Sequence, residues 1–140
     1  MSPIKYLVDT SAVFRIIAAK QVREDWTKHL SEGVIALCDL TELEILFSAR
    51  SANDRLAKED HLAQLFNWTA VPDGVYTRAR RVQQMLTNQG EHRSAGPVDL
   101  LVAAIAELSG LTLLHYDKDF ETVARVTGQP TQWVAPPGTV

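Results

Sequence analysis

Lys5-Tyr6-Leu7-Val8-Asp9-Thr10-Ser11-Ala12 is the stretch that decides the predicted fold, because it joins a short apolar run to a helical pattern over residues 12–18. It predicts a β-strand that ends in one acid and turns directly into a helix. In open sheets of parallel strands, ligands bind at the carboxyl ends of the strands, where helix N-termini point at the gap. Asp9 is therefore either a helix cap or the first residue of a site.

Strands and helices alternate along the rest of the chain. Further strands are predicted at residues 34–38, 69–71, 111–115 and 131–134, the last at a sheet edge. Further helices are predicted at 22–30, 39–50, 53–66, 73–89, 98–106 and 117–127. The helix at 98–106 is apolar on nearly every side, so we expect it to be covered all round. The alternation predicts an α/β fold, a three-layer α/β/α sandwich with a central parallel sheet.

Two helices carry more detailed expectations. In the helix at 39–50, Leu43, Leu46 and Phe47 are expected to share one apolar side. Asn53 is expected to cap the helix that follows, because Asn is a favoured N-cap residue.

Composition sets the limits of what the chain can be. With 140 residues, 46% of them hydrophobic, it is expected to form one domain with a proper core. No run of eighteen apolar residues and no secretory signal pattern occurs, so we expect a cytoplasmic protein without a membrane segment. The single cysteine, Cys38, excludes an internal disulfide and a cysteine-based zinc site. The net charge of −3 argues against a generally basic surface for nucleic acid, although local patches remain possible.

Four acids fall at the same end of the predicted sheet: Asp9, Glu44, Asp99 and Asp117. Each also has a local explanation, since Glu44 follows Thr41 at the spacing of a capping box, Asp99 begins a helix and Asp117 could cap one. The apolar neighbours of Glu44 and Asp99 predict that their carboxylates are drawn toward the interior, where unpaired charges are costly.

A hard divalent cation is the simplest way to neutralise such a group. Carboxylate oxygens suit Mg²⁺ or Mn²⁺, while the single cysteine and the scattered histidines disfavour zinc. A cation of this kind supports phosphodiester hydrolysis, because it lowers the pKa of an attacking water and stabilises the departing oxygen.

Four pieces of the chain, in this order, carry a resemblance to a known family. They are Leu7-Val8-Asp9-Thr10-Ser11-Ala12, Glu42-Leu43-Glu44-Ile45-Leu46-Phe47-Ser48-Ala49-Arg50, Val98-Asp99-Leu100-Leu101-Val102-Ala103-Ala104 and His115-Tyr116-Asp117-Lys118-Asp119-Phe120. The chain resembles PIN-domain proteins, specifically the VapC-type toxin ribonucleases of type II toxin-antitoxin pairs. The resemblance implies a PIN domain over residues 1–135 with a tail at 136–140, and a Mg²⁺-dependent endoribonuclease that forms a homodimer and is silenced by a VapB-like antitoxin.

The resemblance also implies the roles of single residues. It assigns metal binding to Asp9, Glu44, Asp99 and Asp117. Glu42 is a rival for Glu44, but Glu44-Ile45-Leu46-Phe47-Ser48 fits the phrase of the family better. Asp119 is a rival for Asp117 and fits better as a packing partner of Phe120. His115 departs from the family, which often has Thr or Ser two residues before this acid.

Thr10 and Ser11 are expected to contact the metal-binding Asp9 through their hydroxyls without binding the metal themselves. Either hydroxyl lies beside Asp9 in sequence and, with Asp9 assigned to the metal, either would take over the helix cap. His92 and Arg93 precede Asp99 and are candidates for contact with RNA phosphate. The arginines that could extend a basic rim, but that equally fit ordinary solvated charge, are Arg50, Arg78, Arg80 and Arg81. The tryptophans Trp26, Trp68 and Trp133 fit the core or an interface better than base stacking.

Other function classes stay open at this point. One alternative is a PIN-like RNA-binding or RNA-processing protein outside a toxin-antitoxin pair. Another is a receiver-type signalling domain, which needs a pair of acids near the first strand, whereas this chain offers only Asp9 there.

Overall fold

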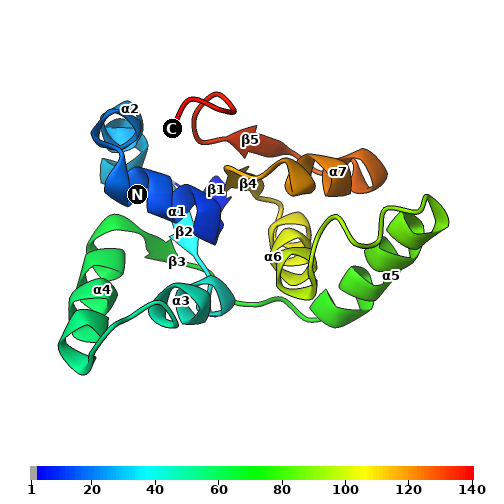
Figure 1. The fold of residues 1–140 in the computed structure, drawn as a ribbon, viewed down its shortest axis with the longest axis horizontal. Coiled ribbons are helices and arrows are strands. Elements are labelled where there is room, and N and C mark those ends of the chain that lie inside the picture. Colours follow the sequence, from blue (N-terminus) through cyan, green and yellow to red (C-terminus); the bar gives the residue numbers. More distant parts are fainter. Residues whose placement is uncertain (1–2) are drawn as a thin grey trace.

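A five-stranded parallel sheet forms the centre of the molecule (Figure 1). The computed structural model describes residues 3–140. The strands are β1 (Tyr6–Val8), β2 (Ile35–Leu37), β3 (Asn67–Trp68), β4 (Thr112–His115) and β5 (Thr131–Trp133), in the order β3-β2-β1-β4-β5. The predicted parallel sheet and the edge strand near the C-terminus are therefore confirmed.

Helices cover both faces of the sheet, which confirms the three-layer prediction. The helices are α1 (Thr10–Ala18), α2 (Lys20–Ser31), α3 (Asp39–Leu46), α4 (Ala52–Leu65), α5 (Val75–Asn88), α6 (Pro97–Leu108) and α7 (Lys118–Thr127). The core on one face is built with α5, α6 and α7, and the core on the other with α1, α2 and α4 (Figure 1). None of the helices in residues 3–140 is long and apolar enough to cross a lipid bilayer.

Alternation along the central strands fills both cores. Leu7 in β1 packs against the α5–α7 side, and its neighbour Val8 packs against the α1 and α2 side. Leu113 and Leu114 in β4 repeat this division one strand away. All four side chains are fully buried, as expected for strands covered on both faces. Helix α6 is as central as predicted, since its residues from Val102 to Ala106 are all buried.

The topology determines where a site can form. The chain leaves β1 toward β2 on one side, and β4 pairs with β1 on the other, so the strand order reverses at β1. The turns after β1 and β4 lie side by side there, because Asp9 N donates to Leu114 O at 3.1 Å. In open α/β sheets this point at the carboxyl ends of the strands is where ligands bind.

Three predicted boundaries are wrong, each for a local reason. The strand expected at 69–71 lies at Asn67–Trp68, because buried Phe66 brings the chain to the sheet edge earlier. Ser51, not Asn53, caps α4, since its hydroxyl accepts from Asp54 N at 3.0 Å. Helix α3 ends at Leu46 instead of near Arg50, and the Ser48 hydroxyl donates to Ile45 O at 2.6 Å just beyond that end.

Of the apolar side expected for the helix at 39–50, Leu46 is buried as predicted, but Leu43 and Phe47 are not. Leu43 is 62% exposed and Phe47 is 91% exposed, whereas Ile45 and Leu46 are buried. Trp68 is also largely exposed, and its indole nitrogen donates to Asp39 Oδ1 at 2.9 Å. Packing on α3 thus follows the side of the helix that meets the sheet, and leaves large apolar side chains at the surface.

Candidate active site

Asp9 lies where β1 turns into α1, and it both caps the helix and places a buried carboxyl at the sheet edge. Its Oδ1 accepts from Ser11 Oγ at 2.7 Å and from Ala12 N at 3.2 Å, so Asp9 itself caps α1 and the expectation that Thr10 or Ser11 would do so is wrong. Its side chain is buried, and this burial raises the pKa of Asp9 to about 6 despite these hydrogen bonds. Asp99 adds a smaller repulsion in the same direction.

Asp99 lies in the first turn of α6, which begins with Pro97 after Gly96, an N-cap residue in extended conformation. Burial raises the pKa of Asp99 to about 6, and repulsion from Asp117 and then from Glu44 adds to the effect. Asp117 and Glu44 are thus each within electrostatic reach of Asp99, and Asp9 joins them through its own repulsion with Asp99.

Asp117 is the N-cap of α7, and its Oδ1 accepts from Asp119 N at 2.9 Å. Asp119 belongs to the same group of charges: burial and the repulsion from Asp117 raise its pKa, and it raises that of Asp99 in turn. The sequence interpretation assigned Asp119 to packing, but Phe120 alone fills the core there, being 1% exposed.

Glu44 reaches the group from α3, and it does so from the surface. The prediction that its carboxylate is drawn into the interior is wrong, because Glu44 is exposed, but the Thr10 hydroxyl donates to its Oε1 and ties it to the turn after β1. No capping box forms, since α3 begins at Asp39 and the Thr41 hydroxyl lies 3.5 Å from Cys38 Sγ.

Glu42 points elsewhere. It lines a separate cleft with Asp60 and Trp68, between α3, α4 and the β3 edge. Glu44 is therefore the acid of this pair that lies with Asp9 and Asp99.

The acids offer a cation oxygen ligands only. Both hydrogen bonds from Ser11 Oγ and Ala12 N go to Oδ1 of Asp9, and Oδ2 takes neither. Within residues 3–140, no three Asp, Glu, His or Cys side chains already stand at ligating distance from a common point. The acids are neighbours that repel one another, and a hard divalent cation is the ligand whose charge and oxygen preference fit them.

Within residues 3–140, none of the predicted basic residues forms an ion pair with the four acids. His92 and Arg93 are exposed in the loop before α6, and within the described residues neither makes a hydrogen bond or an ion pair. Arg78 is engaged in structure, since its Nε and Nη2 bind Glu107 at 2.6 and 2.9 Å. Arg15 was missed: its guanidinium lies 4.5 Å from the ring centre of Tyr116, next to Asp117. Its place in the helix that follows Asp9 directly was the feature of the sequence that could have pointed to it.

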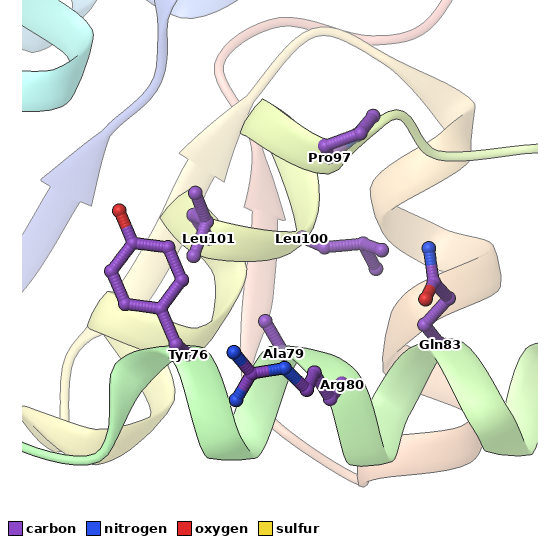
Figure 2. Close-up of a pocket in the computed structure, with 7 residues that line it drawn as sticks. All are labelled: Tyr76, Ala79, Arg80, Gln83, Pro97, Leu100 and Leu101. Atoms are coloured by element: carbon purple, nitrogen blue, oxygen red, sulfur yellow. The ribbon is translucent and has the colours of Figure 1, made fainter.

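An apolar pocket opens beside this region between α5 and α6 (Figure 2). Tyr76, Ala79, Arg80 and Gln83 line it from α5, and Pro97, Leu100 and Leu101 from α6. The acids of the site are not among its lining residues, so it is a neighbour of the acidic group and not part of it.

Comparison with known proteins agrees with this arrangement. The PIN domain family matches residues 6–126. Ribonuclease VapC18 of Mycobacterium tuberculosis is 43% identical over 139 residues, covering 96% of this chain and 98% of its own. Ribonuclease VapC21 of the same organism is 39% identical over 135 residues, covering 96% of this chain and 97% of its own.

A solved structure shares the fold at lower identity. The DNA-bound VapBC of Salmonella typhimurium superposes with a TM-score of 0.76 at 20% identity, over 94% of this chain and 99% of that one. The full-length identity to ribonucleases and the family match lead to one assignment. The chain belongs to the PIN-domain family and, within it, to the VapC ribonucleases of VapBC toxin-antitoxin systems.

Proposed function

We propose that this ribonuclease is a Mg²⁺- or Mn²⁺-dependent endoribonuclease toxin whose cation is held by Asp9, Glu44, Asp99 and Asp117. The observation that carries the proposal is the pair of carboxyls whose pKa values are raised to about 6, Asp9 and Asp99, beside two further acids at the point where the strand order reverses. Such a group gains most from a cation, because binding relieves both the burial cost and the repulsion.

Each residue contributes a defined part of the chemistry. A bound divalent cation supplies a nucleophilic water at neutral pH and stabilises the departing oxygen of a phosphodiester. Asp9 is held in a fixed direction by Ser11 and Ala12, so its carboxylate is preorganised. Glu44 is exposed, and within residues 3–140 its one side-chain hydrogen bond comes from Thr10, so it would be the acid that adjusts most easily to a cation. Asp99 or Asp117 would orient the attacking water.

The RNA strand would approach over the exposed loop before α6. His92 and Arg93 lie there with their side chains in solvent, so they can bind phosphate without first breaking an ion pair. Arg15, whose guanidinium lies over the ring of Tyr116, would add a further cation near the turn after β4. Neutralising Arg93 is expected to weaken RNA binding and to reduce its salt dependence.

The partners proposed are a VapB-like antitoxin and a second copy of this chain. The superposed structures from Salmonella typhimurium and Rickettsia felis are VapBC complexes bound to DNA. Leu43 in α3 and Phe47 just beyond its end are exposed apolar side chains near Glu44, and surfaces of this kind are typical of protein contacts. Phe47→Ser should leave the fold intact and lower the measured mass in light scattering from dimer to monomer, or prevent co-purification with the antitoxin.

The decisive test is cleavage by acid variants. We expect Asp9→Asn and Asp99→Asn to lose RNA cleavage and growth arrest, whereas Asp25→Asn, on the exposed side of α2, keeps both. Calorimetric titration with Mg²⁺ should show binding to wild type and to Asp25→Asn and weaker binding to the two site variants. Undiminished cleavage by Asp9→Asn would disprove the proposed metal ligands, and RNA binding without cleavage in the wild type would favour a non-catalytic RNA-binding protein.

The cytoplasm is the proposed compartment. Mapping the ends of cleaved cellular RNA after induction of the protein would identify the substrate.

A further inference from the structure

His115 lies two residues before Asp117, and the structure gives its buried ring a specific contact with the backbone of that acid. It is the last residue of β4 and is completely buried. Its ring packs against Trp133, with ring centres 4.8 Å apart, and against Phe120, with ring centres 5.4 Å apart. The ring plane is therefore fixed by its aromatic neighbours, and the hydrogen bond described next directs Nδ1.

The buried imidazole binds the backbone of the acidic loop. Asp117 N donates to His115 Nδ1 at 3.0 Å. A ring nitrogen that accepts a hydrogen bond carries no proton, so the proton of the neutral ring is on Nε2. That atom is buried and makes no hydrogen bond within the described residues, and the closest carboxylate oxygen, Glu121 Oε1, lies 3.4 Å away.

The same loop is also held at two nearby amides, those of Tyr116 and Asp119. Tyr116 N donates to Ser11 Oγ at 2.8 Å, and Asp119 N donates to Asp117 Oδ1 at 2.9 Å. His115 supplies the middle bond of this series, the one at the amide of Asp117 itself. If residue 115 offered no acceptor at the position of Nδ1, the amide of Asp117 would have no hydrogen-bond partner. The peptide bond before Asp117 would then be free to turn.

We propose that His115 is a positioning residue, whose Nδ1 fixes the backbone of Asp117 and so aims its carboxylate at the cation site beside Asp99. The inference deepens the proposed function and rests on it, since Asp117 is one of the proposed ligands. Groups that hold a ligand residue typically change metal affinity by about 10-fold to 100-fold when removed.

Three substitutions separate the two ring nitrogens. In His115→Asn the side-chain oxygen takes the place of Nδ1, in His115→Gln it takes the place of Nε2, and His115→Leu has neither acceptor. We expect His115→Asn to keep Mn²⁺ affinity within about threefold of wild type, and the other two to weaken it by about tenfold or more. Glu121→Gln alters the group near Nε2 and its contact with the Thr131 hydroxyl but leaves Nδ1 untouched, so it should bind Mn²⁺ like the wild type.

The test has two readouts, Mn²⁺ binding by paramagnetic resonance and hydrogen exchange of the Asp117 amide by NMR in the metal-free protein. The proposal requires slow exchange of this amide in wild type and His115→Asn, and fast exchange in His115→Gln and His115→Leu. Equal losses in the Asn and Gln variants, or slow exchange in all of them, would overturn it, and this comparison stands even where the Leu variant does not fold. Failure of the wild type to bind Mn²⁺ would count against the proposed metal site, whereas the exchange result tests the His115 contact independently.

Discussion

The hydroxyl of Ser11 joins the turns after β1 and β4, because it accepts a hydrogen bond from the backbone amide of Tyr116 at 2.8 Å while it donates to Asp9 Oδ1 at 2.7 Å. One side chain thus holds two of the loops that carry the proposed metal ligands. The spacing between Asp9 and Asp117 depends on this contact, which links residues 105 positions apart in sequence.

Ser11→Ala should therefore affect both stability and the Asp9 carboxyl. Loss of the two bonds is expected to lower the free energy of unfolding by about 1–2 kcal/mol, measured by urea denaturation. The pKa of Asp9 should rise above about 6, since the Ser11 bond lowers it, and NMR titration would show this. Ser11→Thr keeps the hydroxyl and serves as the control, and an unchanged Asp9 titration in Ser11→Ala would contradict the prediction.

The metal-free protein should lose stability as pH rises from about 4 to 6. Asp9 has an ordinary pKa of 3.8 when unfolded and about 6 when folded, so the folded state binds the proton more tightly in this range. The slope contributed by one such group is at most about 1.4 kcal/mol per pH unit, and it vanishes above pH 6, where Asp9 is ionised in both states. Urea unfolding in EDTA, compared between wild type and Asp9→Asn, isolates this contribution. Excess Mg²⁺ should remove most of the loss, because the cation binds the ionised form.

Glu44→Gln and Glu42→Gln form a matched pair on one helix. Glu44 raises the pKa of Asp99, so Glu44→Gln should lower that pKa and weaken Mg²⁺ binding by about tenfold in calorimetry. Glu42 lines the cleft with Asp60 and Trp68, so Glu42→Gln should leave both quantities unchanged. The reverse pattern would transfer the role to Glu42.

The sequence predicted the sheet and most of the site because both depend on local patterns. Apolar runs followed by acids place Asp9 and Asp117 at strand ends, and the parallel arrangement then brings these ends to one edge. Exposure on α3 could not be predicted, since a single helix pattern does not reveal which side meets the sheet, and so Leu43, Phe47 and Glu44 were expected inside. The contact between His115 and Asp117 was also beyond the sequence, because it depends on a side-chain direction set by Trp133.

Asp99→Asn should change Asp9 in a way that separates burial from repulsion. Burial is the largest cause of the raised pKa of Asp9 and the charge of Asp99 is a smaller one, so the pKa of Asp9 should fall in the variant and yet remain above 3.8. The metal-free variant should also be more stable at pH 7, by about 1 kcal/mol after allowing for the solvent that reaches Asp99, because one partly buried charge is gone. NMR titration of Asp9 and urea denaturation measure the two effects, with Asp25→Asn as the control for loss of an exposed carboxylate.

A variant that loses cleavage while gaining stability would show that Asp99 serves the chemistry and lowers the stability of the folded protein. An Asp9 titration unchanged by Asp99→Asn would mean that the two carboxylates do not share a site.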